Sequence, residues 1–163
     1  MSEPPLDIAR RPANDSDDDF LFEVFFATRA GSLAAANLSD AQIRQLMELQ
    51  FQAQRQHYRA RHPDAEIVIV EIAGEPVGYL NVESTEERIV LVDIALLPAA
   101  RGRGIGTRLL SDLLRAAVAR GLPVVAHDET SNPARRLYRR MGFDEVANDG
   151  AYVEIVRGPE AGS

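Results

Sequence analysis

A glycine-rich segment joins a strand pattern to a helix pattern, and it constrains this chain more than any other feature. It reads Arg101-Gly102-Arg103-Gly104-Ile105-Gly106, after the apolar run 89–97 and before the amphipathic stretch 107–120. Glycine lets a backbone approach a ligand closely and point successive N–H groups at an anion. The helix N-terminus adds a partial positive charge, and the arginines add full charges. The segment therefore predicts a phosphate-binding turn, with a purely structural turn as the alternative.

The glycine spacing excludes two widespread nucleotide-binding loops. It is G-x-G-x-G, whereas the dinucleotide fingerprint is G-x-G-x-x-G, and no Lys-Ser or Lys-Thr pair follows it as in a P-loop. The loop alone therefore predicts an anionic ligand without identifying it.

The length and composition are typical of one globular domain. The 163 residues, 45% of them hydrophobic and 26% charged, can bury a proper core. We expect a single domain over 1–163, with an ordered core at 5–157 and a tail at 158–163. Because the chain has no cysteine, disulfides, thiolate zinc sites and a covalent cysteine intermediate are excluded. No cluster of metal ligands stands out, so we expect no metal.

The charge and the first residues limit the partners. The net charge of -7 argues against general nucleic-acid binding, which needs a basic surface. No apolar run is long enough to cross a membrane, and residues 1–5 lack the basic and apolar parts of a signal peptide. We therefore expect no nucleic-acid partner, no membrane partner and a cytoplasmic location.

The charge is also unevenly distributed along the chain. Residues 1–87 hold 7 arginines against 16 acids, whereas residues 88–163 hold 11 arginines against 9 acids. The half with the glycine loop is therefore the basic half, which suits an anionic ligand. Chance and solvated faces would explain the same asymmetry.

Hydrophobic periodicity and turn residues predict an α/β fold with a mixed central sheet of about six or seven strands flanked by helices. The run 88–97 is apolar on both faces, as in a central strand, and a right-handed crossover would make strand 122–127 parallel to it. The expected strands are 6–10, 66–72, 77–83, 88–97, 122–127, 143–147 and 152–157. The expected helices are 20–28, 40–61 with a Ser39/Gln42 capping box, 107–120 with Leu109, Leu110, Leu113, Leu114 and Val118 inward, and 133–141.

A second motif starts about one strand beyond the helix 107–120. It reads Ser131-Asn132-Pro133-Ala134-Arg135-Arg136-Leu137-Tyr138-Arg139-Arg140-Met141-Gly142-Phe143. With the loop, it resembles the GCN5-related N-acetyltransferase (GNAT) superfamily, which has a loop R/Q-x-x-G-x-G/A and later an Asn, an Ala, Leu-Tyr and Gly-Phe. The matching positions are Arg101, Gly104 and Gly106, then Asn132, Ala134, Leu137, Tyr138, Gly142 and Phe143. The resemblance covers 88–143, and over 1–87 only the order of elements agrees.

The resemblance implies acetyl-CoA as the donor, and the residues suit its chemistry. The amides from Gly102 to Thr107 can bind the pyrophosphate of CoA, and the nearby arginines can screen its charge. The pantetheine chain would pair with strand 94–96 where it separates from strand 122–127, and the Leu96 N–H would polarise the thioester carbonyl. The expected CoA-binding residues are Ile94, Ala95, Leu96, Arg101, Gly102, Arg103, Gly104, Ile105, Gly106, Thr107, Asn132, Arg135 and Tyr138.

The resemblance also implies a general acid, Tyr138. A phenol near the sulfur can protonate the CoA thiolate as it leaves. The alternative is a core tyrosine next to Leu137. Asn132 resembles a CoA-contacting asparagine of the family, but its gap to Tyr138 is one residue shorter than usual and Pro133 follows. A helix N-cap is therefore an equal alternative for Asn132.

A base is needed because an ammonium cannot attack the thioester. Asp93, in an otherwise apolar strand, and His127, at the end of strand 122–127, are equal candidates, and each also has a structural interpretation. Glu83, at the end of strand 77–83, ranks behind them, and Glu129 is expected on the loop surface. A water chain without a dedicated base is the remaining alternative.

These residues together predict acetyl transfer from acetyl-CoA to a primary amine, by direct attack in a ternary complex. The acceptor site is expected between the helices of 15–62, the strand 77–83 and the C-terminal hairpin, where the acidic surplus favours a cationic small molecule. A protein or peptide acceptor, a non-catalytic acyl-CoA-binding or regulatory module, and a nucleotide-binding domain are the alternatives. Dimers are common in the family, so a homodimer stays open beside a monomer.

Overall fold

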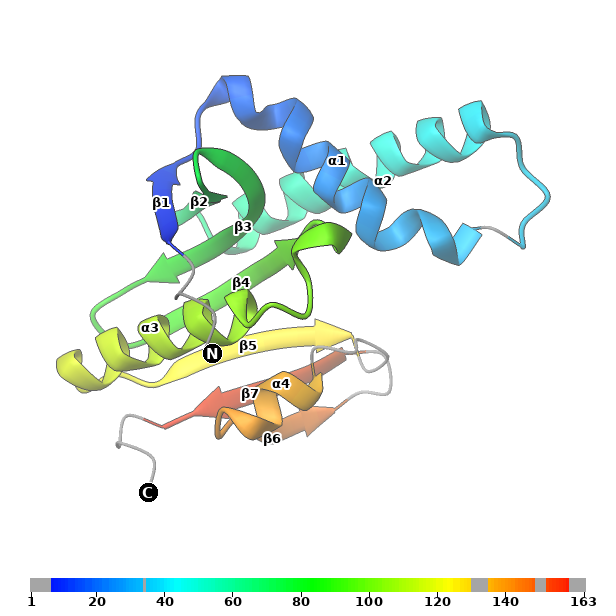
Figure 1. Ribbon diagram of the computed structural model, residues 1–163. Coiled ribbons are helices and arrows are strands. Elements are labelled where there is room, and N and C mark those ends of the chain that lie inside the picture. Colours follow the sequence, from blue (N-terminus) through cyan, green and yellow to red (C-terminus); the bar gives the residue numbers. More distant parts are fainter. Residues whose placement is uncertain (1–6, 34, 130–134, 149–151, 159–163) are drawn as a thin grey trace. The chain divides into compact units, whose positions relative to one another are not determined.

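The structure, a computed structural model, describes residues 7–33, 35–129, 135–148 and 152–158 (Figure 1). The strands form one seven-stranded mixed sheet in the order β1-β2-β3-β4-β5-β7-β6, which confirms the expected fold class and the central place of β4. In chain order the elements are β1 (Ile8–Pro12), η1 (Asp15–Asp17), α1 (Asp18–Arg29), η2 (Ala30–Leu33), α2 (Asp40–Arg61), β2 (Ala65–Ile72), β3 (Glu75–Ser84), β4 (Ile89–Leu96), η3 (Pro98–Ala100), α3 (Ile105–Arg120), β5 (Val124–Glu129), α4 (Arg135–Arg140), β6 (Asp144–Asn148) and β7 (Tyr152–Arg157).

The residues cluster into two compact units. The first unit comprises the chain up to residue 81 together with 93–105, and the second comprises 82–92 together with the chain from 106 onward. The single domain expected over 1–163 stays a prediction, and most of the expected tail, residues 159–163, lies outside the described residues.

The first unit is built on aromatic packing between α1 and α2. The Phe51 ring of α2 lies 5.5 Å from the Phe22 ring and 5.3 Å from the Phe25 ring, centroid to centroid. Ile69 of β2 and Tyr79 of β3 belong to the same buried cluster. Such rings bury large apolar areas, so their packing stabilises the weakly amphipathic α2 against α1. Antiparallel pairing of β1 with β2, from Ile8 opposite Ile72 to Pro12 opposite Val68, extends this unit.

The capping box predicted at the start of α2 is confirmed. The Gln42 backbone N–H donates to Ser39 Oγ at 3.2 Å, and the Ser39 N–H donates to Gln42 Oε1 at 2.8 Å. These bonds satisfy donors that a helix start leaves without intrahelical partners, so the cap fixes where α2 begins.

An ion pair ties β1 to the turn before α1. Arg11 donates from Nη1 and Nη2 to the two carboxylate oxygens of Asp17, at 2.8 and 2.7 Å, and the Asn14 N–H donates to Asp17 Oδ2 at 2.8 Å. Asp17 is buried. The pKa of Asp17 falls from its usual 3.8 to about 2, chiefly because of the hydrogen bonds from Arg11 and then because of the hydrogen bond from the Asn14 backbone.

This pair gives the protein an acid-sensitive stability. Because the folded-state pKa of Asp17 lies below its unfolded value, its stabilisation is present above about pH 4 and is lost as the pH falls toward 2. Asp17→Asn should therefore show a smaller fall in melting temperature between pH 5 and pH 2 than the parent protein. The control is Asp15→Asn, in the same turn but exposed. Equal slopes for the Asp17 variant and the parent would refute this role.

The second unit combines parallel and antiparallel pairing. β4 pairs in parallel with β5 at Ile89–Leu91 opposite Val124–Ala126, as the crossover predicted. β5 pairs antiparallel with β7, and β7 pairs antiparallel with β6, with a register shift between Glu145 and Ala147. The expected C-terminal hairpin is present, and its second strand is the one that joins β5.

Within the described residues, no helix is long and apolar enough to span a bilayer.

The crossover helix α3 starts two residues earlier than the sequence pattern suggested. Its most buried residues are Ile105, Leu109, Leu110, Leu114 and Ala117. Leu113 and Val118, which the pattern placed inward, are only half-buried. The apolar stripe begins at Ile105, so these two residues lie at the flanks of the buried face.

Candidate functional site

The glycine loop leads from η3 to the first turn of α3 and has the features of an anion cradle. Gly102 and Gly104 have φ values of 74° and 80°, and a Cβ at either position would meet no atom within 4 Å. Among the described residues, no hydrogen bond is made by the backbone N–H groups of residues 102–104. The first four N–H groups of a helix also lack intrahelical partners, so free donors continue into α3. These residues fit a bound pyrophosphate.

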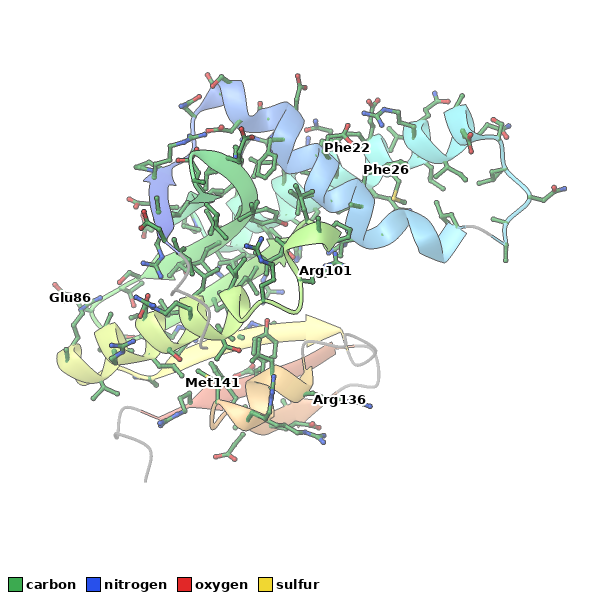
Figure 2. The ribbon with its side chains drawn as sticks, viewed as in Figure 1. Phe22, Phe26, Glu86, Arg101, Arg136 and Met141 are labelled. Carbon is green, nitrogen blue, oxygen red and sulfur yellow. The ribbon has the colours of Figure 1, made fainter. Side chains whose placement is uncertain are left out.

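The arginines of the loop and of the first turn of α3 have different surroundings. Arg101 lies in the segment between β4 and α3 (Figure 2); its Nε donates to the Leu96 carbonyl at 3.1 Å and its Nη2 donates to Thr28 Oγ1 at 3.2 Å. Arg101 therefore braces the loop against β4 and α1, a role the sequence did not reveal. Arg108 pairs with Asp112 at 3.3 Å. Arg103 is exposed and makes no ion pair within the described part of the chain.

The end of β4 is held tightly against β3. The Leu97 N–H donates to the Val77 carbonyl at 2.8 Å. A Cβ at Gly78 would lie 3.1 Å from Leu96 Cα and closer still to the Ala95 carbonyl oxygen, so only glycine fits here. Ile94, Ala95 and Leu96, the expected pantetheine strand, are half-buried. Sequence reasoning missed Gly78, although a lone glycine inside a strand pattern is a signal of close backbone approach.

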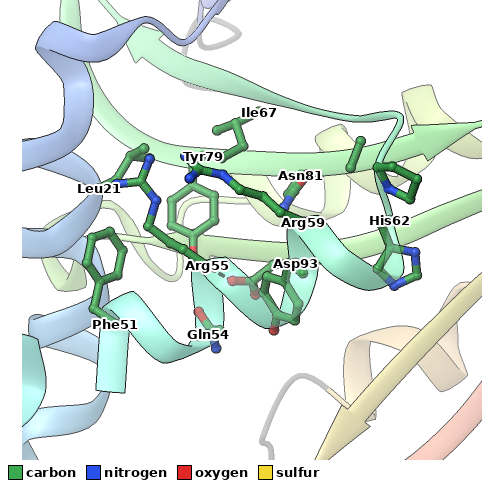
Figure 3. A pocket seen from close by; sticks show the side chains of 13 residues that line it. Leu21, Phe51, Gln54, Arg55, Arg59, His62, Ile67, Tyr79, Asn81 and Asp93 are labelled. Carbon is green, nitrogen blue, oxygen red and sulfur yellow. Dashed lines mark hydrogen bonds between the residues drawn. The ribbon is translucent and has the colours of Figure 1, made fainter. Parts of the chain in front are cut away.

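A pocket in the first unit lies beside this strand (Figure 3). Its volume is about 130 Å³, several times what one water needs. Asp93 of β4 is among its lining residues, and β4 continues from there to Leu96. The lining residues are Leu21, Phe51, Gln54, Arg55, Tyr58, Arg59, His62, Pro63, Ala65, Ile67, Tyr79, Asn81 and Asp93.

Asp93 is held in this pocket by a buried tyrosine. The Tyr79 hydroxyl donates to Asp93 Oδ2 at 2.5 Å. Burial first, and then the neighbouring carboxylate, raises the pKa of Tyr79 well above its usual value, so the phenol stays protonated and keeps donating. Tyr79 was missed from the sequence, because only the pairing of β3 with β4 brings it to Asp93.

Asn81, also missed, lies on the same strand as Tyr79. Its side chain is buried, and its Oδ1 has no hydrogen-bond partner within the described residues. Buried polar atoms are nearly always paired, so this acceptor in a pocket is a place for a donor from a water or from a ligand.

The other two base candidates belong to the second unit. Glu83 is buried on β3, with 7% of its surface exposed. His127 Nε2 lies 3.1 Å from Glu154 Oε2, and the two side chains are 41% and 39% exposed. These residues are register partners on β5 and β7, so a carboxylate lies beside the His127 ring. Glu129, expected on a loop, is instead the last residue of β5, and its side chain lies outside the described side chains.

Tyr138 is a buried residue of α4 in the second unit, with 6% exposure. Its ring packs edge-on against Phe143 at 5.6 Å, and its carbonyl accepts from the Phe143 N–H at 3.0 Å. A Cβ at Gly106 would lie 3.6 Å from Leu137 Cδ2, so the second motif packs beside the first turn of α3. Asn132 lies outside the described residues, and Arg135 begins α4 with its side chain outside the description.

The sequence profile of the Acetyltransferase (GNAT) family matches residues 33–143, which is more than half of the chain. The chain belongs to this family. This confirms the resemblance drawn from the loop and the second motif, and it extends the match into residues before the strand meander.

Two curated relatives resemble this GNAT protein over part of its length. An uncharacterised N-acetyltransferase of Methanocaldococcus jannaschii is 30% identical over 98 residues, covering 55% of this chain and 43% of the relative. The [ribosomal protein bS18]-alanine N-acetyltransferase of Haemophilus influenzae is 32% identical over 71 residues, covering 43% of this chain and 49% of the relative. Each match spans less than half of the relative's length.

Solved structures share the fold over nearly the whole chain. The PaiA N-acetyltransferase of Thermoplasma acidophilum, solved with coenzyme A, superposes with a TM-score of 0.71 at 16% identity, covering 94% of this chain and 99% of that one. The ribosomal-protein-S18-alanine N-acetyltransferase of Escherichia coli has a TM-score of 0.63 at 16% identity, with 96% of each chain covered. At this identity the likeness shows the fold alone.

Proposed function

We propose that this GNAT protein transfers an acetyl group from acetyl-CoA to the primary amine of a small molecule, by direct attack in a ternary complex. The observation that carries the proposal is the set of free N–H donors at 102–104, running into α3 in a chain of this family. The donor supplies an acetyl group activated as a thioester. The coenzyme A in the PaiA structure supports the choice of donor.

Each step of the transfer falls to a residue of this chain. The amides of residues 102–107, with Arg103, bind the pyrophosphate, and the Leu96 N–H polarises the thioester carbonyl. Asp93 removes the proton from the ammonium, and Tyr138 protonates the departing sulfur. Asp93 precedes Leu96 by three residues, about 10 Å along an extended strand, so the pocket lies beside the strand that would hold the thioester.

The pocket also supports a small-molecule acceptor over the alternatives. Its lining comes from α1, α2 and three strands of one unit, and it contains an orphan buried acceptor and a positioned carboxylate. A purely acyl-CoA-binding module needs neither. One relative and one fold neighbour are named as alanine N-acetyltransferases of a ribosomal protein, so a protein or peptide is the second candidate acceptor. A cytoplasmic location and the oligomeric state stay predictions.

The test is acetyl-CoA-dependent release of free CoA with a panel of primary amines, including an amino acid, a diamine and a short peptide. Release that depends on one of the small amines supports the proposal. Release only with the peptide supports the second candidate. Binding of acetyl-CoA with no turnover of any amine would favour the non-catalytic module.

A pair of loop variants tests the donor site independently of the acceptor. Gly104→Asp and Gly104→Asn add nearly the same side chain at a positive φ that both residues tolerate better than most, so strain is matched. The aspartate also puts a negative charge at the pyrophosphate site, and we expect acetyl-CoA to bind it about tenfold more weakly than the asparagine variant. Equal affinities, measured by calorimetry, would exclude this loop as the cradle.

A further inference from the structure

The acceptor pocket is polarised, and its charges differ from those of the surrounding sequence. Residues 1–87 carry an excess of acids, which favoured a cationic acceptor. The described pocket lining, in contrast, holds two arginines, Arg55 and Arg59, against a single carboxylate, Asp93. Asp18 already pairs with Arg55, so Arg59 is the cation that a positively charged acceptor would face, and it favours an acceptor that also carries a negative group.

One part of the pocket presents acceptors for an ammonium. Asn81 Oδ1 is buried and has no hydrogen-bond partner within the described residues, and Asp93 holds its carboxylate beside the Tyr79 hydroxyl. An ammonium has three donors and no acceptor, so it satisfies an amide oxygen and a carboxylate together. The amine that Asp93 would deprotonate therefore has a defined place.

The arginines come from successive turns of α2, where an i, i+4 spacing puts both on one face. Figure 3 shows both side chains extending from α2 into the pocket region. Arg55 is matched by Asp18, with Nη2 3.2 Å from Oδ1. Arg59 is exposed and makes no ion pair within the described ranges. A guanidinium binds a carboxylate through two parallel hydrogen bonds, so Arg59 is available for an anionic group of the acceptor.

Another part of the wall is apolar, beside the polar Gln54, Tyr58 and His62. Leu21, Phe51 and Ile67 line the pocket together with the ring of Tyr79. This apolar part gains free energy when it buries a hydrocarbon group of the ligand. The three parts together describe an amine, a carboxylate and an apolar group on one small molecule.

We propose that the acceptor is a free amino acid with an apolar side chain, bound with its ammonium at Asn81 and Asp93 and its carboxylate at Arg59. This inference rests on the proposed acetyl transfer and names its substrate class. The product is the N-acetyl amino acid: the amine nitrogen bonds to the acetyl carbon, the carbon–sulfur bond breaks, and CoA leaves as the free thiol. A peptide N-terminus lacks the adjacent carboxylate and would bind less well.

The test compares three amines that share an isobutyl group, namely leucine, leucinamide and 3-methylbutylamine. We expect kcat/KM from CoA release to be at least about tenfold higher for leucine than for leucinamide, because a charge-assisted hydrogen bond is lost in the amide. Leucinamide gives up its ammonium proton more readily than leucine, so the comparison is biased against the expected result.

Arg59→Gln should reduce kcat/KM for leucine about tenfold and bring the leucine-to-leucinamide ratio close to one. The matched control is Arg61→Gln, an exposed arginine of α2 that does not line the pocket, which should keep the parent ratio. If kcat/KM for leucinamide or 3-methylbutylamine equals that for leucine, the inference is overturned, whereas the proposed acetyl transfer is not. Turnover of other amines but none of these three would also overturn it. If no amine causes release of CoA, the acetyl transfer itself is contradicted.

Discussion

Tyr138→Phe should lower kcat by about 100-fold with little change in acetyl-CoA affinity. General acid catalysis contributes roughly 10²–10⁴ in rate, and the substitution removes only the hydroxyl that would protonate the sulfur. The phenylalanine ring keeps the edge-on contact with Phe143, so α4 should stay in place. Steady-state kinetics with saturating amine would give kcat, and calorimetry would give the affinity.

The melting temperature provides the control for this variant. An unchanged melting temperature with a lowered kcat assigns the loss to the missing hydroxyl rather than to a disturbed core. If kcat is unchanged, Tyr138 is a core tyrosine, and the departing thiolate takes its proton from water.

Asp93→Asn should lower kcat/KM at neutral pH by about 100-fold, and the defect should shrink as the pH rises. The asparagine keeps the shape and can still accept from the Tyr79 hydroxyl, but it cannot take a proton. At high pH the amine is already deprotonated, so the base is no longer needed. The measurement is kcat/KM against pH for parent and variant with one amine.

Two matched variants separate Asp93 from the other candidates. His127→Gln and Glu83→Gln each remove a titratable group with little change in size, and we expect both to keep most of the activity. His127 is already engaged with Glu154. A pH-dependent loss in the His127 or Glu83 variant, with an active Asp93→Asn, would move the role of base to that residue.

The elements of the sheet were predictable because their signals are local. The apolar run that became β4, the glycines after it and the capping box of α2 are each contained in a short window of sequence. The boundaries shifted by only a few residues, as at the start of α3. The family match also rests on such windows, since the loop and the second motif are contiguous in sequence.

The contacts within the pocket were not predictable, because they depend on which residues face each other across strands. Asp93 stood out as a carboxylate in an apolar strand, but nothing local indicates that Tyr79, fourteen residues earlier, donates to it. The same holds for Asn81, which looks like an ordinary polar residue in an alternating strand. Arg101 could be assigned to the loop by its motif, yet its bonds to Leu96 and Thr28 join segments far apart in sequence.

The helix α2 brings a practical consequence for changing what the protein acetylates. The last part of α2 and the residue after it, at 54–62, supply most of one wall of the pocket, whereas the strand that would hold the thioester and the loop that would hold CoA lie at 93–107. These two stretches are separate in sequence, and α2 is anchored through its buried residues Met47 and Phe51, one to two turns before residue 54. Variant libraries that change only residues 54–62 should therefore change which amine is acetylated and leave acetyl-CoA binding unchanged. This segment is the one to exchange in redesign.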